Sequence, residues 1–167
     1  MSEIEALPPV TLIKDVASLE FDITSGFAPG KFLRGVKEGK LFGQRCPQCH
    51  KVTMPPRGSC AKCGVPTTEE VECGPNGTVT TFCVVNLQFH PSAPPPPYVC
   101  AQVLLDGADM SLFGLIIGMP ADEVRMGVRV HGVWNDPDTW GYSIENMKGF
   151  EPNGEADADY ETYKEYL

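Results

Sequence analysis

Four cysteines in two pairs are the residues of this sequence whose spacing is best suited to chemistry. Cys46 and Cys49 form one Cys-x-x-Cys pair, Cys60 and Cys63 form the other, and ten residues separate the inner cysteines. A two-residue spacing lets both sulfurs of a pair reach one ion, and Zn²⁺ prefers four thiolates in a tetrahedral arrangement. The sequence therefore predicts a structural Zn²⁺ site in a zinc ribbon, where metal replaces the core that so short a segment cannot build.

A redox or disulfide role is the alternative for the paired cysteines. A secreted disulfide framework more often uses an even number of cysteines in a shorter chain, whereas this chain has seven. Metal binding is therefore favoured, and the unpaired Cys73, Cys83 and Cys100 are predicted to be small, buried strand residues. His50 follows the first pair where Gly64 follows the second, and we do not expect it to be a ligand because Cys49 is adjacent.

Length and composition are those of one ordinary domain with a small attached module. The chain has 167 residues, of which 42% are hydrophobic, enough for a real core. No apolar run approaches the ~20 residues of a membrane span. The acidic first twenty residues lack the basic start and apolar block of a signal peptide. We therefore expect a cytoplasmic protein with no membrane partner.

The charge of the chain is unevenly distributed around a net value of −9. Eight basic residues and one acidic residue lie between Lys31 and Lys62, whereas residues 64–150 hold ten acidic and three basic residues. An acidic segment repels nucleic-acid backbones, so no nucleic-acid partner is expected. The compact basic segment suits a phosphate-bearing small molecule or an acidic protein surface, and an ordinary solvated surface is an equal alternative.

The pattern of apolar and turn residues predicts a mainly β protein. One short helix is expected at 31–41, from its apolar face opposite basic residues. Alternating, β-branched segments bounded by glycine, proline and aspartate predict strands. These segments are 68–73, 78–87, 98–105, 110–117, 128–134 and 143–150. Several strands with one long proline-rich loop and no substantial helix favour a small closed barrel of OB type.

Four parts follow from this reading. They are an N-terminal arm (1–29), a helix plus zinc ribbon (30–66), an OB-fold barrel (67–150) and an acidic C-terminal tail (151–167). The arm has too many apolar residues for a free tail, so we expect it to pack on another surface. Tyr160, Tyr163 and Tyr166 recur at every third position of the tail, which fits a short helix, and a disordered acidic tail is the alternative.

The order of motifs between residues 30 and 135 resembles a known family. The matching positions are Lys31–Leu41, Cys46–Cys49, Pro55–Arg57, Cys60–Gly64, Gly74–Val79, Pro96–Val99, Leu105–Gly107 and Gly127–Val130. They resemble the acyl-CoA-associated proteins with a rubredoxin-like zinc ribbon and an OB fold, catalogued as domain of unknown function thirty-five (DUF35).

The resemblance implies a non-catalytic accessory subunit of a thiolase-like enzyme. It implies a hetero-oligomer, which we expect to be a heterotetramer, with acyl-CoA at or near the interface. The Trp-Gly-Tyr segment and the tyrosines of the tail resemble the branch whose partner is a retro-aldolase that cleaves a steroid side-chain CoA thioester. The alternative partner is a condensing enzyme of thiolase or hydroxymethylglutaryl-CoA synthase type.

The residues themselves favour a protein that is not catalytic alone. No nucleophile motif or Ser/His/Asp order stands out, and a closed four-cysteine site leaves no position for water. We predict no catalytic residue here, and the resemblance implies a required subunit of an aldolase (lyase) or acyltransferase complex. The predicted acyl-CoA contacts are Lys31, Arg34, Lys37 and Arg57 for the phosphates and Tyr98 for the acyl or pantetheine part. A nucleic-acid-binding module and a scaffold without acyl-CoA contact are the other hypotheses.

Overall fold

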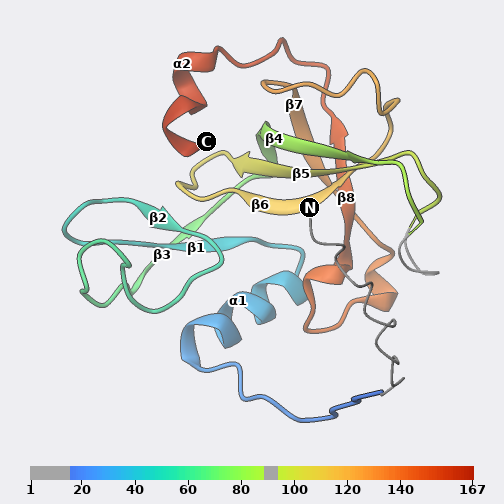
Figure 1. Ribbon diagram of the computed structural model, residues 1–167. Helices are drawn as coiled ribbons and strands as arrows, with labels where there is room; N and C mark the ends of the chain where they lie inside the picture. Colours follow the sequence, from blue (N-terminus) through green and yellow to red (C-terminus); the bar gives the residue numbers. More distant parts are fainter. Residues whose placement is uncertain (1–15, 89–93) are drawn as a thin grey trace, which may run out of the picture.

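The computed structural model describes residues 16–88 and 94–167 and shows a mainly β protein. A small three-stranded sheet and a closed five-stranded barrel lie side by side, and one helix, α1, lies beneath them in Figure 1. The predicted fold class is therefore confirmed. The first half of the predicted N-terminal arm and part of the proline-rich loop lie outside the described residues.

The elements follow one another without a long helix. In chain order they are α1 (Phe27–Lys37), β1 (Phe42–Arg45), β2 (Val52–Thr53), β3 (Glu69–Glu72), β4 (Asn76–Val85), β5 (Tyr98–Leu105), β6 (Leu112–Ile116), β7 (Arg129–Trp134), η1 (Pro137–Thr139), η2 (Ile144–Asn146), β8 (Met147–Pro152), α2 (Tyr160–Tyr163) and η3 (Lys164–Tyr166). None of the helices in the described ranges is long and apolar enough to cross a membrane.

Helix α1 begins and ends four residues earlier than the expected 31–41. Pro29 lies in its first turn, where the missing N–H has no intrahelical partner to lose. The helix ends because Gly39 adopts a left-handed φ of 75°, and its N–H donates to the Val36 carbonyl at 3.1 Å. Phe32 and Val36 are buried on one face, as the apolar pattern predicts.

The zinc-ribbon sheet has β1 at its centre, with β2 on one side and β3 on the other, both antiparallel. Strand β3 (Glu69–Glu72) thus pairs with the ribbon, although its sequence range falls in the segment 67–150 that was assigned to the barrel. Alternation identifies a strand but does not indicate which sheet it joins, and here four residue pairs join it to β1.

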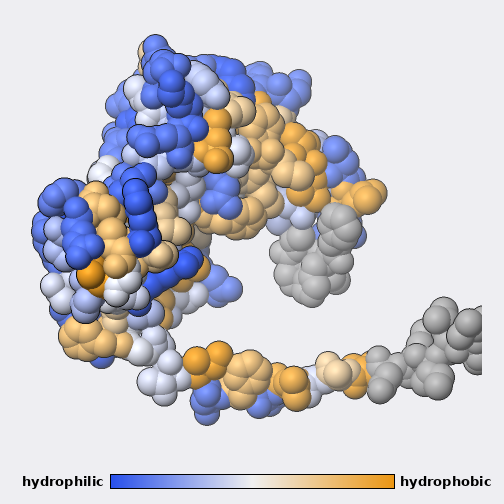
Figure 2. All heavy atoms as spheres, turned by 60° about the vertical axis from the view of Figure 1, so that its left-hand side comes forward, coloured by the Kyte–Doolittle hydropathy of each residue, from blue (hydrophilic) through white to orange (hydrophobic). Residues whose placement is uncertain are grey.

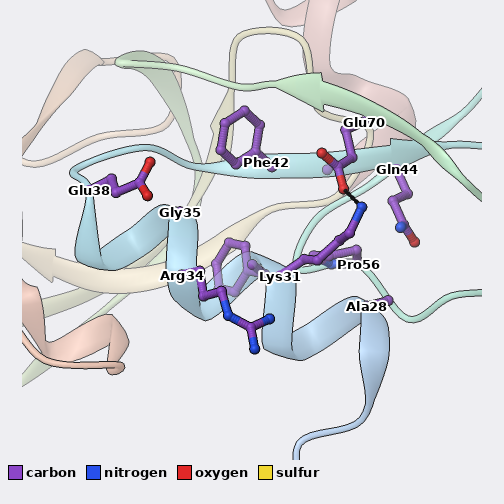
Figure 3. A pocket seen from close by; sticks show the side chains of 11 residues that line it. Ala28, Lys31, Arg34, Gly35, Glu38, Phe42, Gln44, Pro56 and Glu70 are labelled. Carbon is purple, nitrogen blue, oxygen red and sulfur yellow. Dashed lines mark hydrogen bonds and ion pairs between the residues drawn. The ribbon is translucent and has the colours of Figure 1, made fainter.

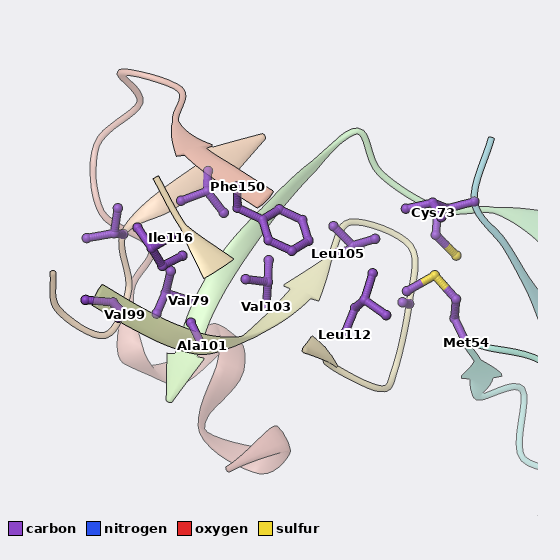
Figure 4. Close-up of a cluster of buried hydrophobic side chains, with 14 of the residues drawn as sticks. Met54, Cys73, Val79, Val99, Ala101, Val103, Leu105, Leu112, Ile116 and Phe150 are labelled. Carbon is purple, nitrogen blue, oxygen red and sulfur yellow. The ribbon is translucent and has the colours of Figure 1, made fainter. Parts of the chain in front are cut away.

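The barrel has the strand order β4-β5-β6-β8-β7, with β7 closing back onto β4. All neighbours are antiparallel except β6 and β8, which are parallel. Along β5 the side chains alternate between half-buried and buried, so one face of the strand fills the interior (Figure 4). Phe150 crosses the interior next to Gly114, where an added Cβ would lie 2.6 Å from its ring.

The ribbon and the barrel share one hydrophobic core. Met54 and Cys73 from the ribbon side and Leu105 and Leu112 from the barrel belong to one buried cluster, as Figure 4 shows. A separate contact joins helix α1 to the segment before β8. There the Asn146 side chain donates to the Val36 carbonyl at 3.2 Å. The two parts therefore form a single packed body.

The acidic tail folds back on the barrel. Tyr163 of α2 is buried, and the Arg125 guanidinium pairs with Asp157 at 2.6 and 2.9 Å. The Ala158 N–H donates to the Gly127 carbonyl at 2.8 Å. Of the two alternatives for this segment, the structure shows the short helix.

Candidate metal centre and basic surface

The two cysteine pairs meet at the tip of the ribbon. The four sulfur atoms of Cys46, Cys49, Cys60 and Cys63 all lie within 4.8 Å of one another, and those of Cys49 and Cys60 are 3.7 Å apart. A tetrahedral zinc ion with Zn–S bonds of about 2.3 Å places its sulfurs about 3.8 Å apart, so the donor set fits zinc. The four residues predicted as ligands are thus brought together.

Each pair sits in a tight turn, and the first turn directs backbone N–H groups at a sulfur. In the first turn the N–H groups of Gln48 and Cys49 point at the Cys46 sulfur, at 3.4 and 3.5 Å. His50 has a φ of 61°, matching the 69° of Gly64 in the second turn. His50 therefore occupies a left-handed backbone position that glycine adopts at lower cost, and it is exposed.

The sulfurs titrate differently when no cation compensates their charge. The backbone N–H of Cys49 lowers the pKa of the Cys46 thiol to about 6. Burial, followed by hydrogen bonds with the neighbouring sulfurs, raises the pKa of the Cys63 thiol to about 12. Four thiolates in so small a volume need a divalent cation, and zinc supplies the positive charge that makes all of them ligands.

The metal centre is built for structure. Four thiolates complete the coordination of zinc and leave no position for water or substrate. Within the described part of the chain, no histidine side chain forms a hydrogen bond with a serine, a cysteine or a carboxylate of the kind that activates a nucleophile.

The remaining cysteines divide by environment. Cys73 is buried, as predicted, and burial raises the pKa of its thiol. Cys100 is half-buried on the outside of β5, and Cys83, directly opposite it on β4, is exposed. The prediction of burial is therefore wrong for Cys83, because outward-facing strand positions of a closed barrel meet solvent.

Of the predicted acyl-CoA contacts, Lys31 and Arg34 line one hollow between α1 and β1 (Figure 3). The hollow has a volume of about 190 Å³. Glu38 and Glu70 also line it, and the Lys31 ammonium pairs with Glu70 at 2.8 Å. The hollow therefore contains two basic and two acidic side chains. Among the described residues no carboxylate lies within 4 Å of the Arg34 guanidinium, whereas Lys31 is paired.

The other predicted contacts lie outside this hollow. Lys37 stacks over the Tyr142 ring at 4.5 Å, at the end of α1. Arg57 is exposed and follows Pro56, which lines the hollow. Tyr98 is half-buried at the start of β5, on the outside of the barrel. The structure therefore groups Lys31 and Arg34 in one hollow, whereas Arg57, Lys37 and Tyr98 are not among the residues that line it.

The sequence analysis assigned no role to Asp109, although it joins three parts of the chain. Its Oδ2 accepts from the Val52 N–H of the ribbon at 2.7 Å, and its Oδ1 accepts from the Tyr166 hydroxyl of the tail at 3.0 Å. Its own N–H donates to the Val52 carbonyl at 2.9 Å. Asp109 lies in the β5–β6 turn, and its position in a turn motif gave no signal of these partners.

A second set of charges fixes the tail to the barrel. The Arg129 guanidinium binds both oxygens of Asp106, at 2.7 and 2.8 Å, and Glu155 at 2.8 Å. These bonds hold the pKa values of Asp106 and Glu155 below their usual range. The bidentate geometry gives a strong, oriented pair between β7 and the β5–β6 turn.

The fold and the site define a zinc-ribbon protein with an OB-type barrel, and family comparison agrees. Residues 34–69 match the family described as ChsH2, rubredoxin-like zinc ribbon domain, and residues 70–135 match ChsH2, C-terminal OB-fold domain. A DUF35 domain-containing scaffold protein of Methanocaldococcus jannaschii is 32% identical over 118 residues, which are 65% of this chain and 82% of that protein. The chain belongs to the DUF35 family.

Two solved structures and one further sequence relative are also similar to this chain. The Ltp2-ChsH2(DUF35) aldolase is 26% identical, with a TM-score of 0.59 over 76% of this chain and 95% of the compared one. A second solved structure is a DUF35 protein of unknown function from Sulfolobus solfataricus, which is 17% identical. The match has a TM-score of 0.57, covers 74% of this chain and 83% of the compared one, and shows the fold alone. A probable enoyl-CoA hydratase alpha subunit of Thermomonospora curvata is 27% identical over 107 residues, 64% of this chain but 33% of that protein.

Proposed function

We propose that this chain is a non-catalytic accessory subunit that binds a thiolase-like enzyme and helps form its acyl-CoA site. The observation that carries the proposal is the similarity to the Ltp2-ChsH2(DUF35) aldolase, which extends over 95% of the compared chain. The closed metal centre adds to it, because it stabilises the ribbon without offering a position for a reacting water.

The proposed reaction of the complex is retro-aldol cleavage of a steroid side-chain CoA thioester, with the chemistry carried out by the partner. The proposed assembly is a heterotetramer. The alternative is a condensing complex of thiolase or hydroxymethylglutaryl-CoA synthase type. The description of the Methanocaldococcus relative as a scaffold protein supports a holding role in either complex. In both cases the chain acts by holding a partner and its substrate.

For the acyl-CoA contact, we propose that only a fragment of the cofactor lies on this chain. The hollow of about 190 Å³ is smaller than the ~300–1,000 Å³ of typical ligand pockets, so it suits one phosphate or the adenine ring. Arg34 is its basic group without a carboxylate partner among the described residues, and the exposed Arg57 follows Pro56 of its lining. Lys31 contacts a CoA phosphate only if its ion pair with Glu70 breaks. Lys37 and Tyr98 contact the rest of the CoA thioester only if the partner protein extends the binding site.

Co-expression with a thiolase-like protein from the same organism tests the proposal. We expect the two proteins to co-purify in fixed ratio and the partner to cleave its CoA substrate faster in the complex than alone. A partner that neither binds this chain nor changes its activity would overturn the proposal. Salt-sensitive retention of single-stranded nucleic acid would instead support a nucleic-acid-binding module.

The contact with CoA is tested separately by Arg34→Ala in the complex. Loss of one phosphate contact should raise the KM for the CoA substrate about tenfold, equivalent to about 1.4 kcal/mol. Lys148→Ala, an exposed change of the same charge on β8, is the control and should leave KM unchanged. Equal KM values for both variants would favour a scaffold without acyl-CoA contact.

A further inference from the structure

The outer face of β4, β5 and β6 carries no charged side chain. The strand register places eight positions on this face, in rows across the three strands. They are Thr81, Gln102 and Phe113 in one row, Cys83, Cys100 and Leu115 in the next, and Val85 and Tyr98 in the last. Phe113 is 62% exposed at one edge of this outer face.

The hydrophobic core of the barrel lies on the other side of these strands, and the C-terminal tail borders the outer face at the hollow that Thr81 and Gln102 line with Tyr166 and Leu167. The opposite sides of the same strands fill the interior, where Val99, Ala101 and Val103 are at most 3% exposed. Strands β7 and β8 carry charged side chains, among them Arg129 and Lys148. The outer face of β4, β5 and β6 is therefore distinct from the rest of the barrel surface, and charge depletion with aromatic residues is typical of the centre of a protein interface.

The described part of the arm, residues 16–26, presents a second apolar surface. Leu19, Phe21 and Ile23 are 71–84% exposed and alternate with Glu20 and Asp22. Figure 2 shows the arm extending from the body, with hydrophobic side chains along the side that faces the barrel and hydrophilic ones along the other. The arm and the barrel thus border one open side of the molecule.

The sizes of the two surfaces indicate that one partner covers both. With strands about 4.8 Å apart and a rise of about 3.3 Å per residue, the outer face measures about 240 Å². Five exposed apolar side chains between Val16 and Phe27, each on the order of 100 Å², add about 500 Å². Together they approach the ~800 Å² per partner of a standard interface, which the outer face alone does not.

Charge decides between a second copy of the chain and a different protein. Each copy carries a net charge of −9, so two copies facing each other repel. The acidic side of the arm, with Glu20 and Asp22, instead suits a partner with an apolar centre and a basic rim. A homodimer through the small outer face is therefore disfavoured both by charge and by area.

We infer that the outer face of β4, β5 and β6, together with residues 16–27 of the arm, is the surface on which the catalytic partner docks. This inference rests on the proposed function, because the partner is the thiolase-like subunit. Phe113 is the apolar anchor on the barrel, and Phe21 is the anchor on the arm. The partner contributes a complementary apolar patch bordered by lysine or arginine.

The test compares matched glutamate variants in a binding assay with the purified thiolase-like subunit. Phe113→Glu places a charge at the apolar anchor of the proposed contact and should raise the Kd at least tenfold. Met126→Glu introduces the same charge at a 39% exposed site in the connection between β6 and β7, and should bind like wild type. Unchanged zinc content and unfolding temperature confirm that both variants are folded.

Thiol alkylation provides a second readout that needs no variant. The exposed Cys83 should react with iodoacetamide in the isolated chain and become protected in the complex, whereas the buried Cys73 should stay unreactive in both. Wild-type binding by Phe113→Glu, or equal Cys83 labelling with and without partner, overturns the inference while the proposed function stands. Failure of the wild-type chains to associate overturns both. If the wild-type chain formed a homodimer that Phe113→Glu dissociates, the outer face would bind a second copy of this chain. That result would also overturn the inference.

Discussion

Replacing Asp109 with alanine should loosen the ribbon, the barrel and the tail at once. The Asp109 carboxylate accepts hydrogen bonds from the Val52 N–H at 2.7 Å and the Tyr166 hydroxyl at 3.0 Å. Val52 is only 2% exposed, so water does not readily replace the lost acceptor. The substitution leaves a buried donor without a partner and releases the end of the tail.

The magnitude follows from these two bonds. An unsatisfied buried N–H costs about 1–3 kcal/mol, and the tyrosine hydrogen bond contributes about 0.5–1.5 kcal/mol, so Asp109→Ala should lower the free energy of unfolding by about 2–4 kcal/mol. For a chain of this size that corresponds to a fall in Tm of about 5–15 °C. The backbone bond from the Asp109 N–H to the Val52 carbonyl remains, so the ribbon should stay attached.

Thermal and urea unfolding of the zinc-loaded chain measure this effect. Asp122→Ala is the matched control, because Asp122 is exposed in a turn, and such substitutions usually change stability by less than about 0.5 kcal/mol. Asp109→Asn keeps one acceptor oxygen, so its loss of unfolding free energy should lie between those of Asp109→Ala and Asp122→Ala. If Asp109→Ala lowered the free energy of unfolding by less than about 1 kcal/mol, the Asp109 carboxylate would not be what holds the ribbon and the tail to the barrel.

Three further changes test the metal centre and the tail. Cys49→Ser should lose zinc, unfold the ribbon and prevent assembly with the partner, as metal analysis and co-purification would show; assembly without zinc would make the ribbon dispensable. Gly64→Ala should cost about 1–2 kcal/mol, because φ is 69° and a Cβ would meet nothing within 4 Å, so only backbone strain acts. Urea unfolding measures this loss of stability, and a loss near zero would refute backbone strain at position 64. Burial, then the Asp109 bond, raises the pKa of Tyr166 to about 12 in the folded chain, so its contribution to stability is complete below pH 10 and lost as pH rises toward 12. Tyr166→Phe should therefore lower stability at pH 8 and flatten its decline above pH 10 in unfolding experiments; an unchanged pH profile would contradict this linkage.

Local patterns were sufficient for the ribbon and most of the barrel. The cysteine spacing predicted four sulfurs that meet within 4.8 Å, and the alternation in 98–105 became the regular burial pattern of β5. The predicted strands 98–105 and 110–117, separated by the turn residues Asp106 and Gly107, pair as β5 and β6. These features depend on neighbours in sequence, which is why the sequence predicts them.

Long-range contacts explain what local patterns left open. Arg125 and Asp157 are 32 residues apart, and their pair helps order a tail that by composition alone suits disorder equally well. Asp109 and Val52 are 57 residues apart, so no motif reveals their bond. The basic segment likewise looked uniform in sequence, yet Glu70, far along the chain, pairs with Lys31 and leaves Arg34 as the candidate phosphate contact.

The most direct test of the accessory role is a titration of the thiolase-like subunit with this chain. Steady-state cleavage of its CoA thioester should rise with added chain, reach a plateau at a fixed molar ratio, and stay at the basal rate with the Cys49→Ser variant. Activity that is the same with and without the wild-type chain, or catalysis by this chain alone, would contradict the account.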